Sequence, residues 1–166
     1  MLRKVSDHAA APATAGPVTE SVLLRRPNPA LDELFRSSPS GPVPEGDLTG
    51  MLVAFSGTPL ARPLAVLTHV FAWQGKVVSS TNGTLVNKLS PFGVRAVKAL
   101  VGVDDSWVDG KPCVVLDYSR TSLVARPVRD EIRLVGPHLY LGIAWLGRRR
   151  VAWFTVREPT RAARHS

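Results

Sequence analysis

The chain has 166 residues, of which 45% are hydrophobic and 20% charged, and a formal net charge of +8. This length corresponds to one domain, and this apolar content excludes a natively disordered chain. The charge lies mostly at the ends: residues 1–28 carry four basic and two acidic side chains, and residues 148–166 carry six arginines and one glutamate. Because the body between them is almost neutral, we interpret the ends as solubilising segments and expect no nucleic-acid partner.

The single cysteine, Cys113, cannot form an internal disulfide, and no second cysteine supplies metal-ligand spacing. The N-terminal segment starts with basic residues but has no continuous apolar run, so no secretory signal is predicted. Residues 51–73 contain one charged side chain, Arg62, yet two prolines and a glycine interrupt them, and no apolar stretch of about 20 residues remains. We therefore expect a cytoplasmic protein without stable membrane insertion, and the oligomeric state stays open.

The first part of the chain, residues 1–28, is rich in alanine, proline and threonine without periodicity, which predicts a flexible leader. Residues 29–158 are expected to form the folded domain, and residues 159–166 a basic tail. Within the folded part, the turn-rich residues 37–46 predict a linker.

A helix is predicted at the start of the domain. Asn28 is a favourable N-cap, and Pro29 suits the first helical position because its missing N–H has no partner there. Leu31, Leu34 and Phe35 would form an apolar stripe that braces the main fold.

Apolar segments and turn residues then predict a series of strands. Residues 49–56 are apolar on both faces, and residues 63–73 follow a proline as a helix that is apolar all round. Four turn signals separate later strand-like runs, and Asn-Gly and Asp-Gly are the strongest of them because type I′ turns need positive φ. These signals are Asn82-Gly83, Asp109-Gly110, Gly136-Pro137 and Gly147.

The predicted fold is mainly β: roughly eight antiparallel strands in a lipocalin-like barrel, with short flanking helices. Two short helical segments are expected near residues 91–100 and 122–127. The strands are expected near residues 49–56, 75–81, 84–89, 101–108, 112–119, 129–135, 138–146 and 150–157.

Three runs of the sequence carry a resemblance to a known group: WQGKV, LDYSRTS and RDEIRLVGPHLYLG. In these runs the chain resembles an uncharacterised group of small bacterial β-barrel proteins of the lipocalin-like, calycin type. The resemblance covers about residues 46–157 and implies a barrel with an enclosed cavity, but no defined activity. The G-x-W motif of lipocalins has no counterpart, since the matching run GDLTGM lacks the tryptophan.

Carboxylates next to apolar positions are the candidate site residues. Alternation along residues 129–135 places Asp130 on the apolar face with Ile132, and Glu131 on the other face. In the run CVVLDYS both faces are apolar, so either Asp117 or Tyr118 points inward, and the sequence leaves that choice open.

A buried carboxylate needs a partner, and Asp130 is expected to meet an arginine, a tyrosine hydroxyl or backbone amides. Its candidate partners are Arg126, Arg129, Tyr118 and Tyr140. Asp130, Asp117 and Tyr118 are the candidate catalytic residues, by proton transfer or by holding a ligand hydroxyl. A structural ion pair is the favoured interpretation of Asp130, because such pairs also perturb pKa values.

Aromatic and histidine side chains extend the list of candidates. Tryptophans can line a flat apolar cavity for polycyclic or lipid-like ligands, although core packing explains them equally well. His69 and His138 are candidate haem ligands, but no accompanying signature supports them. The candidate ligand-binding residues are Tyr140, Arg126, Trp73, Trp145 and Trp153.

The sequence thus predicts a protein that binds a hydrophobic small molecule, such as an acyl, polyketide or terpenoid compound, in its barrel. The alternative is a cofactor-free cyclase or isomerase that acts on such a molecule by acid/base catalysis and confinement. A haem-binding barrel is a weaker alternative. No cofactor or metal is expected, since the common nucleotide, hydrolase and zinc motifs are absent from the sequence.

Overall fold

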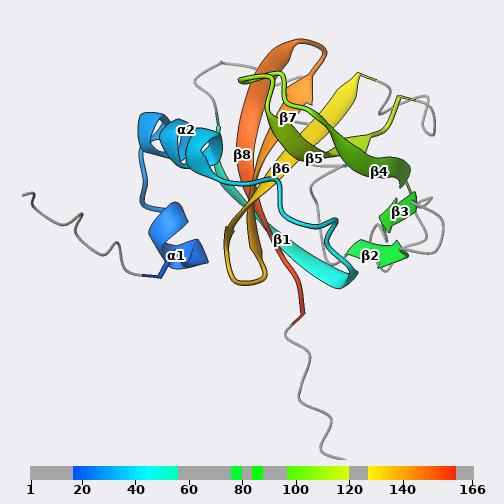
Figure 1. The fold of residues 1–166 in the computed structure, drawn as a ribbon, viewed down its shortest axis with the longest axis horizontal. Helices are drawn as coiled ribbons and strands as arrows, with labels where there is room; N and C mark the ends of the chain where they lie inside the picture. The colour runs from blue at the N-terminus through cyan, green and yellow to red at the C-terminus, as the bar shows by residue number, and fades with distance from the viewer. Residues whose placement is uncertain (1–16, 56–75, 80–83, 88–96, 120–126, 160–166) are drawn as a thin grey trace, which may run out of the picture.

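The computed structural model describes residues 17–55, 76–79, 84–87, 97–119 and 127–159. These residues form two short helices and eight strands (Figure 1). The elements are α1 (Glu20–Leu23), α2 (Asn28–Ser37), β1 (Gly46–Phe55), β2 (Lys76–Ser79), β3 (Thr84–Asn87), β4 (Val97–Asp105), β5 (Pro112–Asp117), β6 (Val128–Gly136), β7 (Leu139–Leu146) and β8 (Arg149–Arg157).

All strands belong to one antiparallel sheet. Six longer strands run side by side in the order β4, β5, β6, β7, β8 and β1, and the four-residue strands β2 and β3 lie between β1 and β4. Because β1 pairs with β2 on one side and with β8 on the other, the ladder of strand pairs returns to its first strand. The prediction of a mainly β, antiparallel fold with short flanking helices is confirmed.

One predicted helix is wrong where the structure describes it. Residues 97–100 belong to strand β4 and pair with β3, rather than ending a helix over residues 91–100. The alternating residues of this segment favour an extended chain once β3 and β5 supply partners on both sides. The predicted helix at 63–73 and most of that at 122–127 lie outside the described residues.

The predicted turns also differ in detail. The chain between β4 and β5 is not a two-residue Asp109-Gly110 turn but a loop over residues 106–111. It is closed by hydrogen bonds from the Ser106 amide to the Lys111 carbonyl, 3.0 Å, and from the Gly110 amide to the Ser106 carbonyl, 2.9 Å. The turn between β6 and β7 consists of Pro137 and His138, with a positive φ of 55° at His138. Turn composition therefore located these connections without fixing their length.

The sheet separates two apolar cores, one on each face. The inner face holds Val114, Leu116, Ile132, Tyr140 and Phe154 among its buried residues. The outer face of β7 and β8 holds a second cluster that includes residues of both helices. Successive residues of a strand point to opposite faces, so β7, which is buried from Leu139 to Trp145, contributes to both cores.

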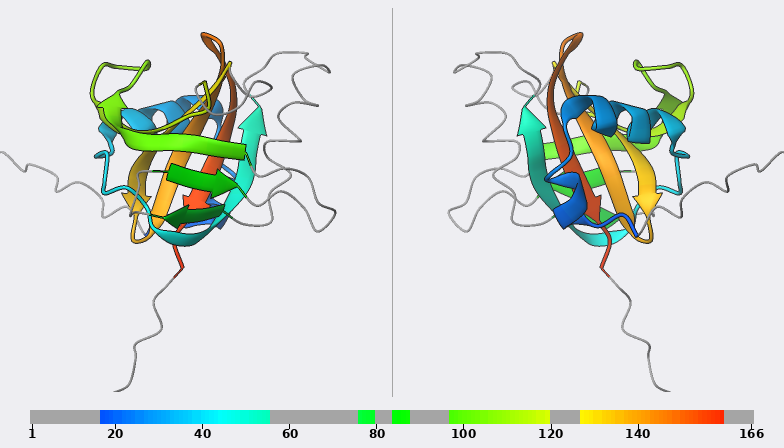
Figure 2. Two further views of the ribbon diagram at one scale, coloured as in Figure 1. Left: turned by 90° about the vertical axis from the view of Figure 1, so that its right-hand side faces the viewer. Right: turned by 90° about the vertical axis from the view of Figure 1, so that its left-hand side faces the viewer.

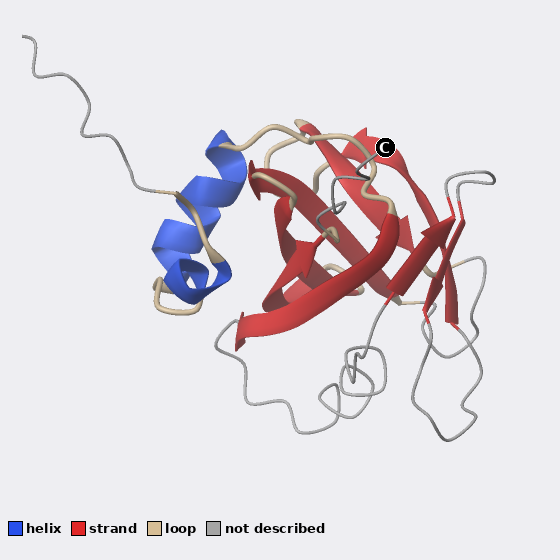
Figure 3. Cartoon of the chain, turned by 90° about the horizontal axis from the view of Figure 1, so that it is seen from below, coloured by secondary structure: helices blue, strands red, loops and turns tan. Residues whose placement is uncertain are grey.

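Both helices cover the outer face, as the right-hand view of Figure 2 and the view in Figure 3 show. Leu31 and Phe35 of α2 are completely buried, and the Phe35 ring meets the Trp153 ring edge to face, with centroids 6.0 Å apart. Leu23 of α1 is also completely buried in this cluster. The segment 17–28 is thus part of the folded domain, which corrects the prediction of a flexible leader over residues 1–28. Its one buried leucine was too weak a pattern to reveal a helix of four residues.

The linker from α2 to β1 packs against one end of the inner core. The Tyr140 hydroxyl donates a hydrogen bond to the Pro42 carbonyl, 3.0 Å, and the Leu134 amide donates to the Pro39 carbonyl, 3.0 Å. Gly41 lies between them with a φ of 71°, and a Cβ atom there would lie 2.6 Å from the Leu134 Cβ. The linker therefore closes this end of the inner face.

Replacing Gly41 by alanine is expected to destabilise the protein by about 2–4 kcal/mol, since a positive φ costs an L-residue about 1–2 kcal/mol and the overpacking adds about as much. Gly110→Ala is the matched control, because Gly110 has a φ of 68° but nothing within 4 Å of the added Cβ. The free energy of unfolding, measured with urea, should fall in Gly110→Ala only by the contribution of the positive φ, about 1–2 kcal/mol. Equal losses in both variants would contradict the close packing of the linker.

Candidate functional site

Asp130 lies on the inner face, near the start of β6. Its neighbours across the sheet are Leu116 on β5 and Ala144 on β7, and its side chain is completely buried. The Tyr118 hydroxyl lies 3.3 Å from Asp130 Oδ2 and donates to it. The structure thus places two of the predicted catalytic residues together in an apolar interior, and the orientation inferred from alternation along β6 agrees with the register.

The pairing of β5 with β6 settles which face of β5 points inward. Val114 and Leu116 lie opposite Ile132 and Asp130, and Tyr118 follows on the same face. Asp117 therefore lies on the outer face, where it is half-buried and its Oδ1 accepts a hydrogen bond from the Ser119 amide, 2.8 Å. The two candidate aspartates do not converge on one site.

Tyr140 is also an inner residue, but its hydroxyl is directed to the linker rather than to Asp130. Burial raises the pKa of Tyr140 to about 12, and the nearby Glu158 carboxylate acts in the same direction. The phenol is therefore neutral over the physiological pH range. Its position makes it a closing contact of the far end of the inner core, away from the Tyr118 hydroxyl.

Two of the three candidate tryptophans do not face Asp130. Trp145 and Trp153 belong to the outer cluster beneath the helices, where Trp153 contacts Phe35. This corrects the expectation that they line the same cavity as Asp130, because alternation puts them on the face opposite Ala144 and Ala152. Trp73 and Arg126 lie outside the described residues.

Glu131 lies on the face opposite Asp130, as alternation along β6 predicts. It points to the outer face but is completely buried, because the loop of residues 106–111 folds over it. Its Oε2 accepts from the Ser106 hydroxyl, 2.6 Å, and its Oε1 accepts from the Trp107 amide, 2.9 Å, and from Arg129 Nε, 3.1 Å. Arg129, a predicted partner of Asp130, thus forms an ion pair with Glu131. Sequence periodicity identified the face but carried no signal for the loop that covers it.

The inner face is not sealed at every position. Leu52 lies opposite Phe154, and Val103 lies opposite Val114, so both point to the inner face. Nevertheless Leu52 is 39% exposed and Val103 is 59% exposed. The core-facing side of the sheet is thus in contact with solvent at these two positions.

The remaining titratable candidates are placed differently. His138 lies on the exposed turn between β6 and β7, with Nδ1 3.0 Å from Glu158 Oε2, and does not face the interior. His69 lies outside the described residues. Cys113 is buried, and burial together with the Glu131 carboxylate raises its pKa to about 12, so its thiol is unreactive.

Neither a metal-binding group of side chains nor a membrane-spanning helix is present in the described part of the chain. No group of three or more histidine, cysteine, aspartate or glutamate side chains there is arranged to hold a metal ion. No helix there has both the length and the apolar character needed to cross a bilayer.

Comparison with known proteins identifies a fold but no activity. No protein-family profile and no curated protein matches the chain. A solved structure of a protein from Thermomonospora curvata is similar, with a TM-score of 0.53 and 18% identity, over 81% of this chain and 89% of that one. At this identity the similarity concerns the fold alone.

Proposed function

We propose that the protein binds a hydrophobic small molecule inside a lipocalin-like barrel, with Asp130 and Tyr118 as its polar anchor. The observation that supports this most is a carboxylate completely buried between Leu116 and Ala144 with a tyrosine hydroxyl at 3.3 Å. Binding cavities for small molecules are mostly apolar with a few placed polar groups that orient the ligand. A hydroxyl or ketone group of an acyl, polyketide or terpenoid compound fits such an anchor.

The linker covers one end of the inner face, which supports entry of a ligand from the other end or from the side. The linker over residues 39–45 packs across the end that contains Tyr140 and Leu134. Tyr118 and Asp130 lie toward the other end, where β5 ends and β6 begins. The exposed, inward-pointing Leu52 and Val103 add an apolar opening along the side. A ligand entering from either place reaches Asp130 without displacing the linker.

The alternative function is a cofactor-free cyclase or isomerase. It is favoured by the same contact, because a carboxyl group and a phenol 3.3 Å apart can move one proton to and from an enclosed substrate. Confinement of a flexible substrate lowers the entropic part of the barrier, so few other residues are needed.

The first test is native mass spectrometry of the purified protein, where a retained small molecule supports an internal site. The second compares 1-naphthol with 1-methylnaphthalene, which differ by a hydroxyl and a methyl group, as fluorescent probes. Asp130→Asn is expected to weaken 1-naphthol binding about tenfold, the loss of a hydrogen bond to a charged group, and to leave 1-methylnaphthalene unchanged.

The matched control is Asp117→Asn, which makes the same chemical change on the outer face and should affect neither probe. Equal weakening by both variants, or no saturable binding of either probe, contradicts the proposed site. Carrier and enzyme are then distinguished on the retained molecule: an enzyme converts it, and Asp130→Asn or Tyr118→Phe abolishes conversion while binding persists. A carrier returns it unchanged after incubation with the wild-type protein.

A further inference from the structure

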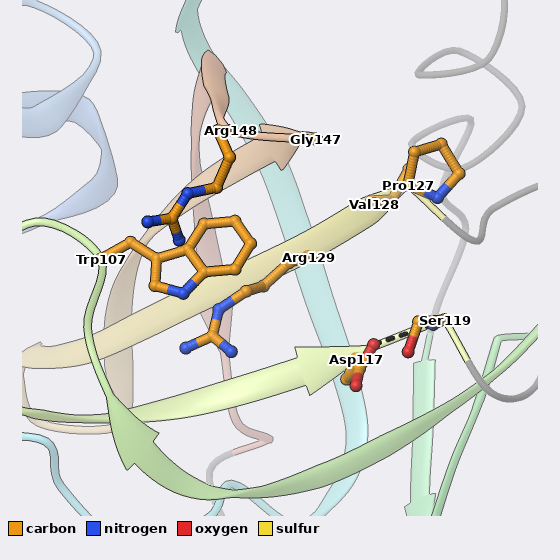
Figure 4. A pocket seen from close by; sticks show the side chains of 8 residues that line it. All are labelled: Trp107, Asp117, Ser119, Pro127, Val128, Arg129, Gly147 and Arg148. Atoms are coloured by element: carbon orange, nitrogen blue, oxygen red, sulfur yellow. Dashed lines mark hydrogen bonds between the residues drawn. The ribbon is translucent and has the colours of Figure 1, made fainter.

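A cavity with a volume of about 350 Å³ lies on the outer face where β5 ends and the turn from β7 to β8 begins (Figure 4). We call it the rim pocket. The residues that bear on its chemistry are Trp107, Asp117, Ser119, Arg129, Gly147 and Arg148. Pro127 and Val128 complete its lining, and Val128 also belongs to the inner core, so the rim pocket adjoins the interior at Val128 while its charged groups lie on the outer face.

Two arginines approach the same indole ring in this pocket. The guanidinium carbon of Arg148 lies 4.4 Å from the centre of the Trp107 ring, and that of Arg129 lies 4.5 Å from it. In the view of Figure 4, Arg148 comes from above the indole and Arg129 from below. Such contacts are favourable because the ring face carries negative electrostatic potential.

The two arginines differ in their other partners. Arg129 donates to the carboxylates of Glu131, 3.1 Å, and Asp104, 3.3 Å, and to the Asp105 carbonyl, 2.8 Å. Arg148 makes no hydrogen bond and no ion pair to any residue in the described part of the chain. Its charge is therefore available for a ligand, whereas that of Arg129 is already compensated.

The indole that carries Arg148 is itself held in place. The Trp107 amide donates to Glu131 Oε1, 2.9 Å, and its ring meets the Trp145 ring edge to face, with centroids 5.6 Å apart. A guanidinium stacked on a fixed ring keeps the N–H groups of its edge directed outward, so less side-chain freedom is lost when an anion binds.

The charges around the cavity indicate which ligand fits. Asp117 lies at the other side of the pocket, where its carboxylate accepts from the Ser119 amide. One uncompensated cation facing one carboxylate favours a ligand with a single negative charge. Trp107 is 39% exposed and offers apolar surface beside Arg148. We propose that the rim pocket binds a small organic carboxylate, with the Arg148 guanidinium edge holding the carboxylate group and Trp107 positioning Arg148.

Benzoate is a suitable probe, because it combines a carboxylate with an apolar ring. Titrated at constant ionic strength into the ¹⁵N-labelled protein, it is expected to shift the Trp107 indole and Arg148 Nε signals saturably. Benzamide, the neutral analogue, should bind at least about tenfold more weakly, since it cannot form charge-assisted hydrogen bonds. Inorganic phosphate tests the preference for a single charge and should also bind more weakly. Equal binding of benzoate and benzamide, or of benzoate and phosphate, overturns the proposed ligand class.

Variants separate the pocket from general charge attraction. Arg148→Gln should weaken benzoate about tenfold or more, whereas Arg149→Gln, the same change on the adjacent exposed residue, should leave affinity within about twofold. Trp107→Phe should retain most of the affinity and Trp107→Ala should lose it, with the melting temperature showing that both remain folded. Equal losses in the two arginine variants would mean that benzoate follows the net charge, and the proposal fails. The interior site is unaffected by either outcome.

Discussion

Replacing Arg133 by methionine is expected to lower the free energy of unfolding by about 3–5 kcal/mol, because one partner of a buried ion pair is then left alone. The Arg133 side chain is completely buried and donates to both oxygens of Asp109, at 2.8 and 2.7 Å. It also donates to the carbonyls of Phe35, 3.0 Å, Lys111, 3.0 Å, and Pro112, 3.2 Å. One guanidinium thus joins α2, the loop of residues 106–111 and β6.

Urea unfolding measures this loss, and Arg36→Met is the matched control. Arg36 is 44% exposed, pairs with Asp32 on the same helix and donates to the Val108 carbonyl, 3.1 Å, so its removal should cost about 1 kcal/mol or less. A loss below about 1 kcal/mol for Arg133→Met would show that the buried network contributes little to stability.

The pH dependence of stability gives a second measurement of the ion pair between Arg133 and Asp109. The hydrogen bonds from Arg133 hold the pKa of Asp109 below its ordinary value of 3.8 although burial opposes them. A carboxylate with a lowered pKa in the folded state stabilises the protein above the unfolded-state value, and that stability is lost as the pH falls through the folded-state value. Below about pH 4 the wild type should therefore lose stability more steeply than Arg133→Met. If the stability of the wild type and of Arg133→Met fell equally with pH, the effect of Arg133 on the pKa of Asp109 would be contradicted.

Replacing Gly142 by alanine is expected to lower the free energy of unfolding by about 1–3 kcal/mol, because the added methyl group overpacks the inner core. Gly142 lies on β7 opposite Phe154, and a Cβ atom there would overlap Phe154 Cζ and lie 2.6 Å from Cε2. The ring is buried in the inner core, so it has little space into which it can move.

The control is Gly102→Ala, in strand β4, where nothing lies within 4 Å of the added Cβ. It should be neutral or stabilising by up to about 1 kcal/mol, because alanine restricts the unfolded chain. Adding Phe154→Leu to Gly142→Ala should recover part of the loss, measured as a coupling energy in a double-mutant cycle. Strict additivity would show that the ring does not lie over Gly142.

The strands could be predicted from the sequence because each depends on local pattern. Alternation along β6 was sufficient to orient Asp130, since Ile132 and Leu134 mark one clearly apolar face. It failed for β5, where both faces are apolar and only pairing with β6 decides that Tyr118 points inward. The catalytic roles of Asp130 and Tyr118 stay predictions.

The errors in the predicted surroundings of the candidate residues have a common physical cause. Period-two alternation tells which face a side chain occupies, but not which distant segment covers that face. Glu131 is buried by residues 106–111, and Trp153 is buried by Phe35, more than one hundred positions earlier. The four-residue helix α1, which covers the same face, has no periodicity to detect. The rim pocket combines Trp107 with Arg148 in the same way, from the loop between β4 and β5 and the turn between β7 and β8.

The position of the helices on β7 and β8 bears on how the chain folds during synthesis. Helices α1 and α2 leave the ribosome before all eight strands, yet the surface they cover is made by β7 and β8. β1 must likewise wait for β8 before most of its backbone is paired. The apolar stripe of α2 stays without its native cover until β7 and β8 have been synthesised, which predicts slow folding and a nascent chain prone to chaperone binding.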